Sequence, residues 1–66
     1  MRYRIKQLRE SAGLTQEDLA KRSGVSRAII SGLESGKITV TTTKTLGKIA
    51  DALEVRPGEL FFEEVV

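Results

Sequence analysis

The chain has 66 residues and a formal net charge of +2, and it contains neither cysteine nor histidine. This length fits a single domain with a small core, so we expect residues 1–66 to form one domain. Without these two residue types the chain cannot form a disulfide, a thiolate nucleophile, an imidazole base or the usual zinc site, and no metal or cofactor is expected. No apolar run approaches the ~20 residues that span a bilayer. No signal peptide is visible either, so a cytoplasmic location without a membrane partner is expected.

The charges are unevenly distributed along the sequence. Residues 1–48 contain ten of the eleven basic residues against four acids, which gives +6, whereas residues 49–66 contain one arginine against five acids, which gives −4. A basic section in a small domain favours a polyanionic partner. Solubility alone explains the same charges equally well.

Apolar residues recur at helical spacing in most of the chain. A first helix is expected at residues 2–11, with Ile5, Leu8 and Ala12 on one face. Gly13 suits the left-handed residue that ends a helix.

A second helix is expected after Thr15, which is a good N-cap. Asp18 lies at the third helical position, which is close to a capping box. Leu19 and Ala20 face inward, and Gly24 ends the helix.

Ser26 is expected to cap a third helix that extends to about Glu34, with Val25, Ile30 and Leu33 in the core. The β-branched residues 38–41 resist helix formation and are expected to form an extended loop.

A fourth helix should follow its N-cap Thr42. Its core residues repeat at helical spacing and are Leu46, Ile49, Ala50 and Leu53. Pro57 suits the first turn of a short fifth helix that brings Leu60 and Phe61 onto the core. For the end of the chain, FFEEVV, a strand and a frayed terminus both remain open.

The pattern Q-x-x-x-A-x-x-x-G-V-S-x-x-x-I-x-x-x-E-x-G extends from Gln16 to Gly36. Set among five short helices, it resembles the phage-repressor and Cro type of helix-turn-helix protein, the XRE family. The resemblance covers residues 4–61. It implies a compact all-α, five-helix fold like that of lambda repressor, with the helix-turn-helix at 16–35 and a C-terminal tail at 62–66. An ordinary helical hairpin is the alternative interpretation.

The same resemblance implies a sequence-specific regulator of transcription, and a repressor in particular. It would bind double-stranded DNA as a homodimer on a palindromic operator, with the third helix in the major groove. The alternative is an antitoxin-type module that neutralises a partner protein. An enzyme is not expected, because no paired catalytic groups and no glycine-rich phosphate loop are found.

Four residues are expected on the outer face of the third helix, where the family places its base contacts: Arg27, Ala28, Ser31 and Gly32. Arg27 suits the O6 and N7 atoms of guanine, with a phosphate contact or a solvated side chain as alternatives. Ala28 suits a thymine methyl group, and Ser31 suits either base type.

Two neighbouring positions have open interpretations. A glycine at position 32 costs the helix about 1 kcal/mol relative to alanine. Gly32 therefore indicates either close approach to DNA or a lost base contact. We expect Ile29 to be half-buried, with a thymine contact as the alternative.

The resemblance also implies phosphate contacts on both sides of this helix. Gln16 is the family's position at the start of the second helix, where backbone donors favour an anion. The other candidates are Ser35, Lys37, Thr39 and Lys44 within the segment up to residue 44. This loop lacks the family's usual proline, and the threonines are otherwise a connector without contacts. The resemblance further implies a salt bridge between Arg9 and Glu34.

No sensor domain and no small-molecule site are evident, so dimerisation is expected to come from this domain. The expected interface is the apolar C-terminal end, with pairing of FFEEVV strands as one option. Its residues are Leu60, Phe61, Phe62, Val65 and Val66.

Overall fold

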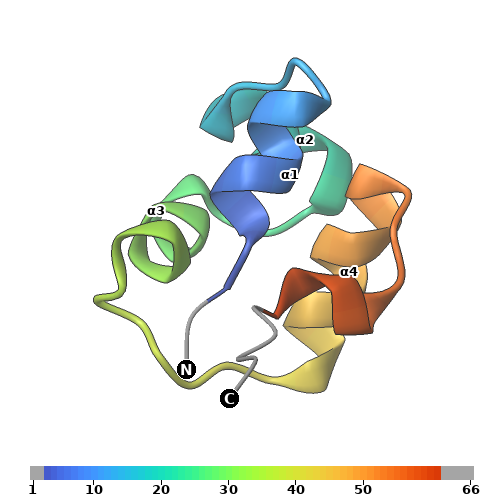
Figure 1. The fold of residues 1–66 in the computed structure, drawn as a ribbon. Helices are drawn as coiled ribbons and strands as arrows, with labels where there is room; N and C mark the ends of the chain where they lie inside the picture. The colour runs from blue at the N-terminus through green and yellow to red at the C-terminus, as the bar shows by residue number, and fades with distance from the viewer. Residues whose placement is uncertain (1–2, 62–66) are drawn as a thin grey trace.

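A computed structural model describes residues 3–61 (Figure 1). Four α-helices follow one another within these residues: α1 (Ile5–Ser11), α2 (Gln16–Ser23), α3 (Arg27–Ser35) and α4 (Thr43–Leu53). A 3-10 helix, η1 (Pro57–Leu60), comes last. No strand forms within residues 3–61, and an isolated antiparallel bridge joins Tyr3 to Phe61. The all-α fold is therefore confirmed.

The expected fifth α-helix is wrong, because η1 is a 3-10 helix of four residues. Its hydrogen bonds link residues three apart: Glu59 N–H donates to Arg56 O, and Phe61 N–H donates to Gly58 O. Pro57 occupies its first turn as expected. A 3-10 helix is the usual form for so short a turn.

α1 begins at Ile5 and not at residue 2. Tyr3 pairs with Phe61, and Arg4 N–H donates to Leu60 O at 2.6 Å. These contacts with the distant η1 segment hold Tyr3 and Arg4 outside the helix. Ala12 is the C-cap of α1 and is exposed, so its expected place on the core face is wrong.

Three of the helices begin as the sequence predicts. The side chains of Thr15, Ser26 and Thr42 each accept a hydrogen bond from a backbone N–H three residues later, at 3.0, 3.2 and 3.1 Å. Thr15 N–H in turn donates to Asp18 Oδ2 at 3.0 Å, which completes a capping box. This bond from the Thr15 backbone, followed by hydrogen bonding from the Thr15 side chain, lowers the pKa of the Asp18 carboxyl. Such caps satisfy backbone donors that a helix start leaves unpaired.

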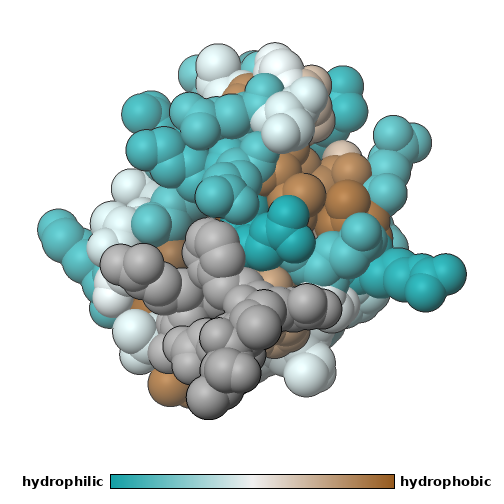
Figure 2. All heavy atoms as spheres, in the orientation of Figure 1, coloured by the Kyte–Doolittle hydropathy of each residue, from teal (hydrophilic) through white to brown (hydrophobic). Residues whose placement is uncertain are grey.

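The helices enclose one apolar core (Figure 1). Its buried residues are Ile5, Leu19, Val25, Ile30, Leu33, Leu46, Ile49, Ala50, Leu53 and Leu60. α2 packs against α3 and α4, while η1 packs against α4. Figure 2 shows mostly hydrophilic side chains over α1, with apolar atoms gathered between α1 and the C-terminal part of α4. Within residues 3–61, none of the helices is long and apolar enough to cross a membrane.

Candidate nucleic-acid interface

One side of α3 packs on the core, and the other side is exposed. The turn before it contains Gly24, with a left-handed φ of 73° that suits a residue without Cβ, and the buried Val25. On its inner side, Ile30 is 0% exposed and Leu33 is 2% exposed. The core therefore fixes the direction in which α3 presents its remaining side chains.

Three of the four candidate base-reading residues are exposed, namely Arg27, Ala28 and Ser31. Arg27 is the first residue of α3, next to the cap Ser26, and the other two follow within the first five residues of the helix. In helix-turn-helix proteins, residues near the start of the second helix reach the base edges. Ile29 is 37% exposed, so part of its side chain remains accessible as well.

The expected exposure of Gly32 is wrong. Gly32 is buried, and a Cβ atom added to it would come within 2.5 Å of the Ile38 side chain. Ile38 N–H also donates to Gly32 O at 3.0 Å. The loop after α3 therefore folds back and covers this position, which explains the glycine by protein packing.

The Arg9–Glu34 ion pair is present. Arg9 Nε lies 2.8 Å from Glu34 Oε2, and Arg9 Nη2 lies 3.0 Å from Glu34 Oε1. The two side chains are 11% and 4% exposed. Arg9 Nη1 also donates to Leu14 O at 2.8 Å. The hydrogen bond to Glu34 raises the pKa of Arg9. The pair joins α1 to the end of α3.

Gln16, a candidate phosphate contact, belongs to the same network. Its Nε2 atom donates to Glu34 Oε1 at 3.2 Å. This bond ties the first residue of α2 to α3. The sequence motif contains both residues but gives no sign that they meet, because eighteen positions separate them.

Two surface hollows share Arg9 and Gln16 in their linings. The first extends along the end of α1 and the start of α2 to Arg27, and the second is also lined by Lys6, Ser31 and Ser35. Gln16 therefore borders hollows that reach both the start and the later turns of α3. Lys6 was missed by the sequence analysis, because it belongs to α1 and to no motif. The only indication in the sequence was that Lys6 is basic and lies on the polar face of that helix.

The remaining phosphate candidates lie around the α3–α4 loop and are exposed: Ser35, Lys37, Thr39 and Lys44. Ser35 Oγ donates to Gly32 O at 3.3 Å and accepts from Lys37 N–H at 3.4 Å. The Tyr3 hydroxyl donates to Thr39 O at 3.1 Å. Lys44 lies beyond the loop, in the first turn of α4.

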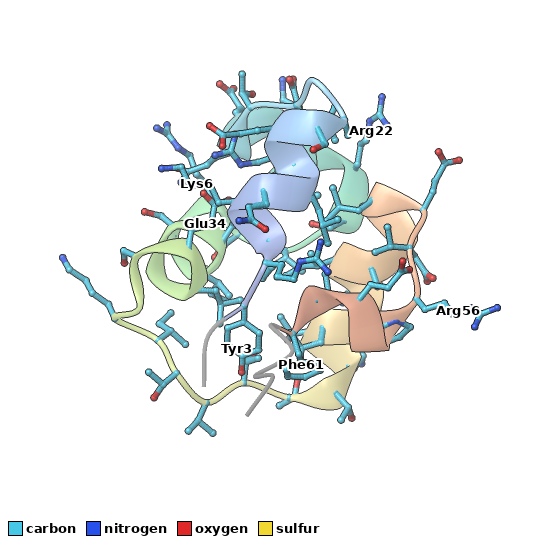
Figure 3. All side chains as sticks on the ribbon, viewed as in Figure 1. Tyr3, Lys6, Arg22, Glu34, Arg56 and Phe61 are labelled. Atoms are coloured by element: carbon cyan, nitrogen blue, oxygen red, sulfur yellow. The ribbon has the colours of Figure 1, made fainter. Side chains whose placement is uncertain are left out.

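The interface expected at the C-terminal end needs a correction. Leu60 is 0% exposed in the core of its own chain, so it has no surface to offer a partner. Phe61 is half-buried, and its ring centroid lies 5.5 Å from that of Tyr3 (Figure 3). Phe62, Val65 and Val66 lie outside the described residues.

A family model described as Helix-turn-helix, HTH_3, matches residues 5–60. The chain belongs to this helix-turn-helix family. The resemblance to XRE-type proteins is thereby confirmed. The chain carries a DNA-binding domain of the kind used in transcription regulation.

Several proteins are similar over most of the chain. An uncharacterised HTH-type transcriptional regulator of Archaeoglobus fulgidus is 43% identical over 92% of this chain and 86% of its own length. The HTH-type transcriptional repressor RghR of Bacillus subtilis is 45% identical over 77% of this chain and 38% of its own length. Among solved structures, the restriction-modification controller protein C.AhdI from Aeromonas hydrophila shares 41% sequence identity with this chain. It superposes with a TM-score of 0.80 over 88% of this chain and 86% of that protein.

Proposed function

We propose that this chain is a repressor of transcription that binds a palindromic operator as a homodimer. The observation that carries the proposal is the exposed N-terminal part of α3, held by a buried inner face and a part-buried ion pair. A helix presented in this way fits the major groove. The similarity to RghR, an HTH-type transcriptional repressor, supports the choice of repressor.

The proposed base contacts are those of the exposed α3 residues. Arg27 pairs bidentately with the O6 and N7 atoms of a guanine, which is the commonest specific contact in the major groove. Ala28 touches a thymine methyl group, and Ser31 bonds either base type. Gly32 is not proposed as a base contact, because Ile38 covers it.

The proposed backbone contacts flank α3. Gln16 lies at the N-terminus of α2, where free backbone N–H groups and the helix dipole favour a phosphate. On the other side the contacts come from exposed hydroxyl and amino groups, which commonly bind phosphate. They are Ser35, Lys37, Thr39 and Lys44.

A single domain of this size reads few base pairs, so a second copy is proposed. Two domains on half-sites about 34 Å apart match a palindromic operator. Phe61 is half-buried at the end of the described chain, and it is followed in sequence by three further apolar residues, Phe62, Val65 and Val66. These four side chains are proposed to form the contact between copies.

Control of a restriction–modification system is a second candidate for the biological role. It is favoured by the similarity to C.AhdI, which covers most of both chains. The location of the operator separates the two roles: a site upstream of restriction or methyltransferase genes supports the second, and its absence there supports the first.

Selection of bound DNA from random sequence tests the proposed function. The expected result is a two-fold-symmetric motif whose half-sites are about one helical turn apart, roughly 34 Å. Enrichment of no motif, or of an asymmetric single site, would contradict the proposal.

Replacing Arg27 by alanine should relax the specificity at one guanine position per half-site. The loss of a bidentate contact is expected to weaken operator binding by about 1–3 kcal/mol per half-site. Binding is measured on operators that differ at each base pair. The matched control is Arg56→Ala, which removes the same charge from a side chain on the opposite side of the molecule from α3 (Figure 3). Equal weakening on all sequences would assign Arg27 to the DNA backbone.

Removal of residues 62–66 should convert the dimer to a monomer. Because each copy then binds its half-site alone, operator affinity should fall as well. Sedimentation measures the mass, and titration with operator DNA measures the affinity. An unchanged mass together with unchanged affinity would place the dimer contact elsewhere.

A further inference from the structure

Ile38 occupies the space in which a side chain of residue 32 would lie. A Cβ atom on Gly32 would come within 2.5 Å of Ile38 Cδ1 and 2.6 Å of Ile38 Cγ1. Non-bonded carbon atoms do not approach so closely. A loop side chain therefore fills the position on α3 that the glycine leaves empty.

This position borders the exposed face of α3. Residues four apart on a helix are neighbours on its surface, so the group that covers Gly32 lies beside Ala28. Ala28 is exposed, and Ile38 is half-buried, with part of its side chain packed on the core. Ile38 thus adds a branched alkyl group at the edge of the face that carries the base-reading residues.

The loop is fixed on both sides of this side chain. Ile38 N–H donates to Gly32 O at 3.0 Å, and the Tyr3 hydroxyl donates to Thr39 O at 3.1 Å. A side chain that is already held in place loses little conformational freedom when it meets a ligand. Ile38 is therefore arranged as a preformed contact.

We propose that Ile38 determines specificity by packing on the C5 methyl group of a thymine in the major groove, next to the base pair faced by Ala28. The proposal rests on the proposed function, in which α3 enters that groove. Among the four bases only thymine presents a methyl group there. An isoleucine side chain has no donor or acceptor for the other base edges, so the contact selects thymine by its apolar surface.

The test combines a change in the protein with the removal of one methyl group from the DNA. The full chain and its selected operator are used, and each thymine in turn is replaced by deoxyuridine. At one thymine per half-site, the wild-type protein is expected to lose about fourfold in affinity, the value for burying one methyl-sized group. Ile38→Ala should bind the two DNAs equally at that position, and Ile38→Val should give an intermediate ratio.

The controls come from the same surface. Val40→Ala removes an apolar side chain from the same loop, 86% exposed, and should keep the wild-type sensitivity to deoxyuridine. Ile29→Ala should keep it too. Circular dichroism establishes that each variant is folded. The proposal would be overturned if Ile38→Ala, at every thymine, lost as much affinity on replacement by deoxyuridine as the wild-type protein does. It would also be overturned if Ile29→Ala no longer lost affinity on deoxyuridine replacement, or if Ile38→Ala bound all DNA sequences more weakly by the same factor.

Failure of this inference differs from failure of the proposed function. If Arg27→Ala relaxes the specificity at a guanine position while recognition of no thymine depends on Ile38, the inference fails and the proposed function stands. If no motif is selected and Arg27→Ala changes no binding, the proposed function fails and the inference fails with it.

Discussion

Replacing Leu60 by alanine is expected to lower the free energy of unfolding by about 3 kcal/mol, within the usual range for a buried leucine. Leu60 is 0% exposed, and η1 packs it against α4. A domain of this length has a total stability of roughly 3–10 kcal/mol, so this loss is a large fraction of it. Urea denaturation followed by circular dichroism measures the change.

Measuring this loss of stability at several protein concentrations shows whether Leu60 acts in the core of one chain or at an interface between two copies. Since Leu60 is buried within one chain, the loss should be the same at every protein concentration, whereas an interface residue would give a loss that depends on concentration. Val40→Ala is the control, because Val40 is 86% exposed and should change stability by less than about 0.5 kcal/mol. If Leu60→Ala left the free energy of unfolding unchanged, the described core would be contradicted.

Replacing Glu34 by alanine is the second change with a large expected effect, also about 3 kcal/mol of unfolding free energy. It leaves the part-buried Arg9 without its carboxylate and Gln16 without its acceptor. We expect the low end of the range for broken buried pairs, because Arg9 keeps its bond to Leu14 O and remains 11% exposed. Thermal or urea unfolding measures the loss.

Two comparisons show whether the unpaired charge causes this loss. Glu17 also forms an ion pair, with Lys21 at 3.7 Å, but both side chains are mostly exposed. Glu17→Ala should therefore cost no more than about 0.5 kcal/mol. The double variant Arg9→Met, Glu34→Leu should be more stable than Glu34→Ala, because it removes both charges. If the double variant is less stable than Glu34→Ala, the unpaired charge of Arg9 is not the cause of the loss.

Local signals in the sequence predicted much of the fold. Each cap acts on the backbone of the helix that directly follows it, so Thr15, Ser26 and Thr42 were recognisable from their neighbours. The spacing of apolar residues in α3 and α4 predicted their buried faces, since helical periodicity is also local. The exception is Glu54, which ends α4 with a left-handed φ of 58° although it is not a glycine. No residue type marks that end.

Features that depend on distant residues were not predictable in this way. The start of α1 is displaced by pairing with η1, which lies more than fifty positions later. The cover over Gly32 comes from a loop whose path no local pattern specifies. At the candidate site, the Arg9–Glu34 pair was expected only through the family resemblance. The bond from Gln16 to Glu34 became visible only when three helices were placed together.

The exposed part of α3 has a consequence for how such a protein can acquire new targets. Within residues 3–61, the side chains of Arg27 and Ser31 take part in none of the hydrogen bonds or ion pairs, and Ala28 is exposed. Mutations at these three positions are therefore expected to leave the scaffold unchanged, and under the proposed function they would alter which operator is preferred. Regulators with different targets can evolve from one such scaffold, or be engineered from it, without compensating changes elsewhere.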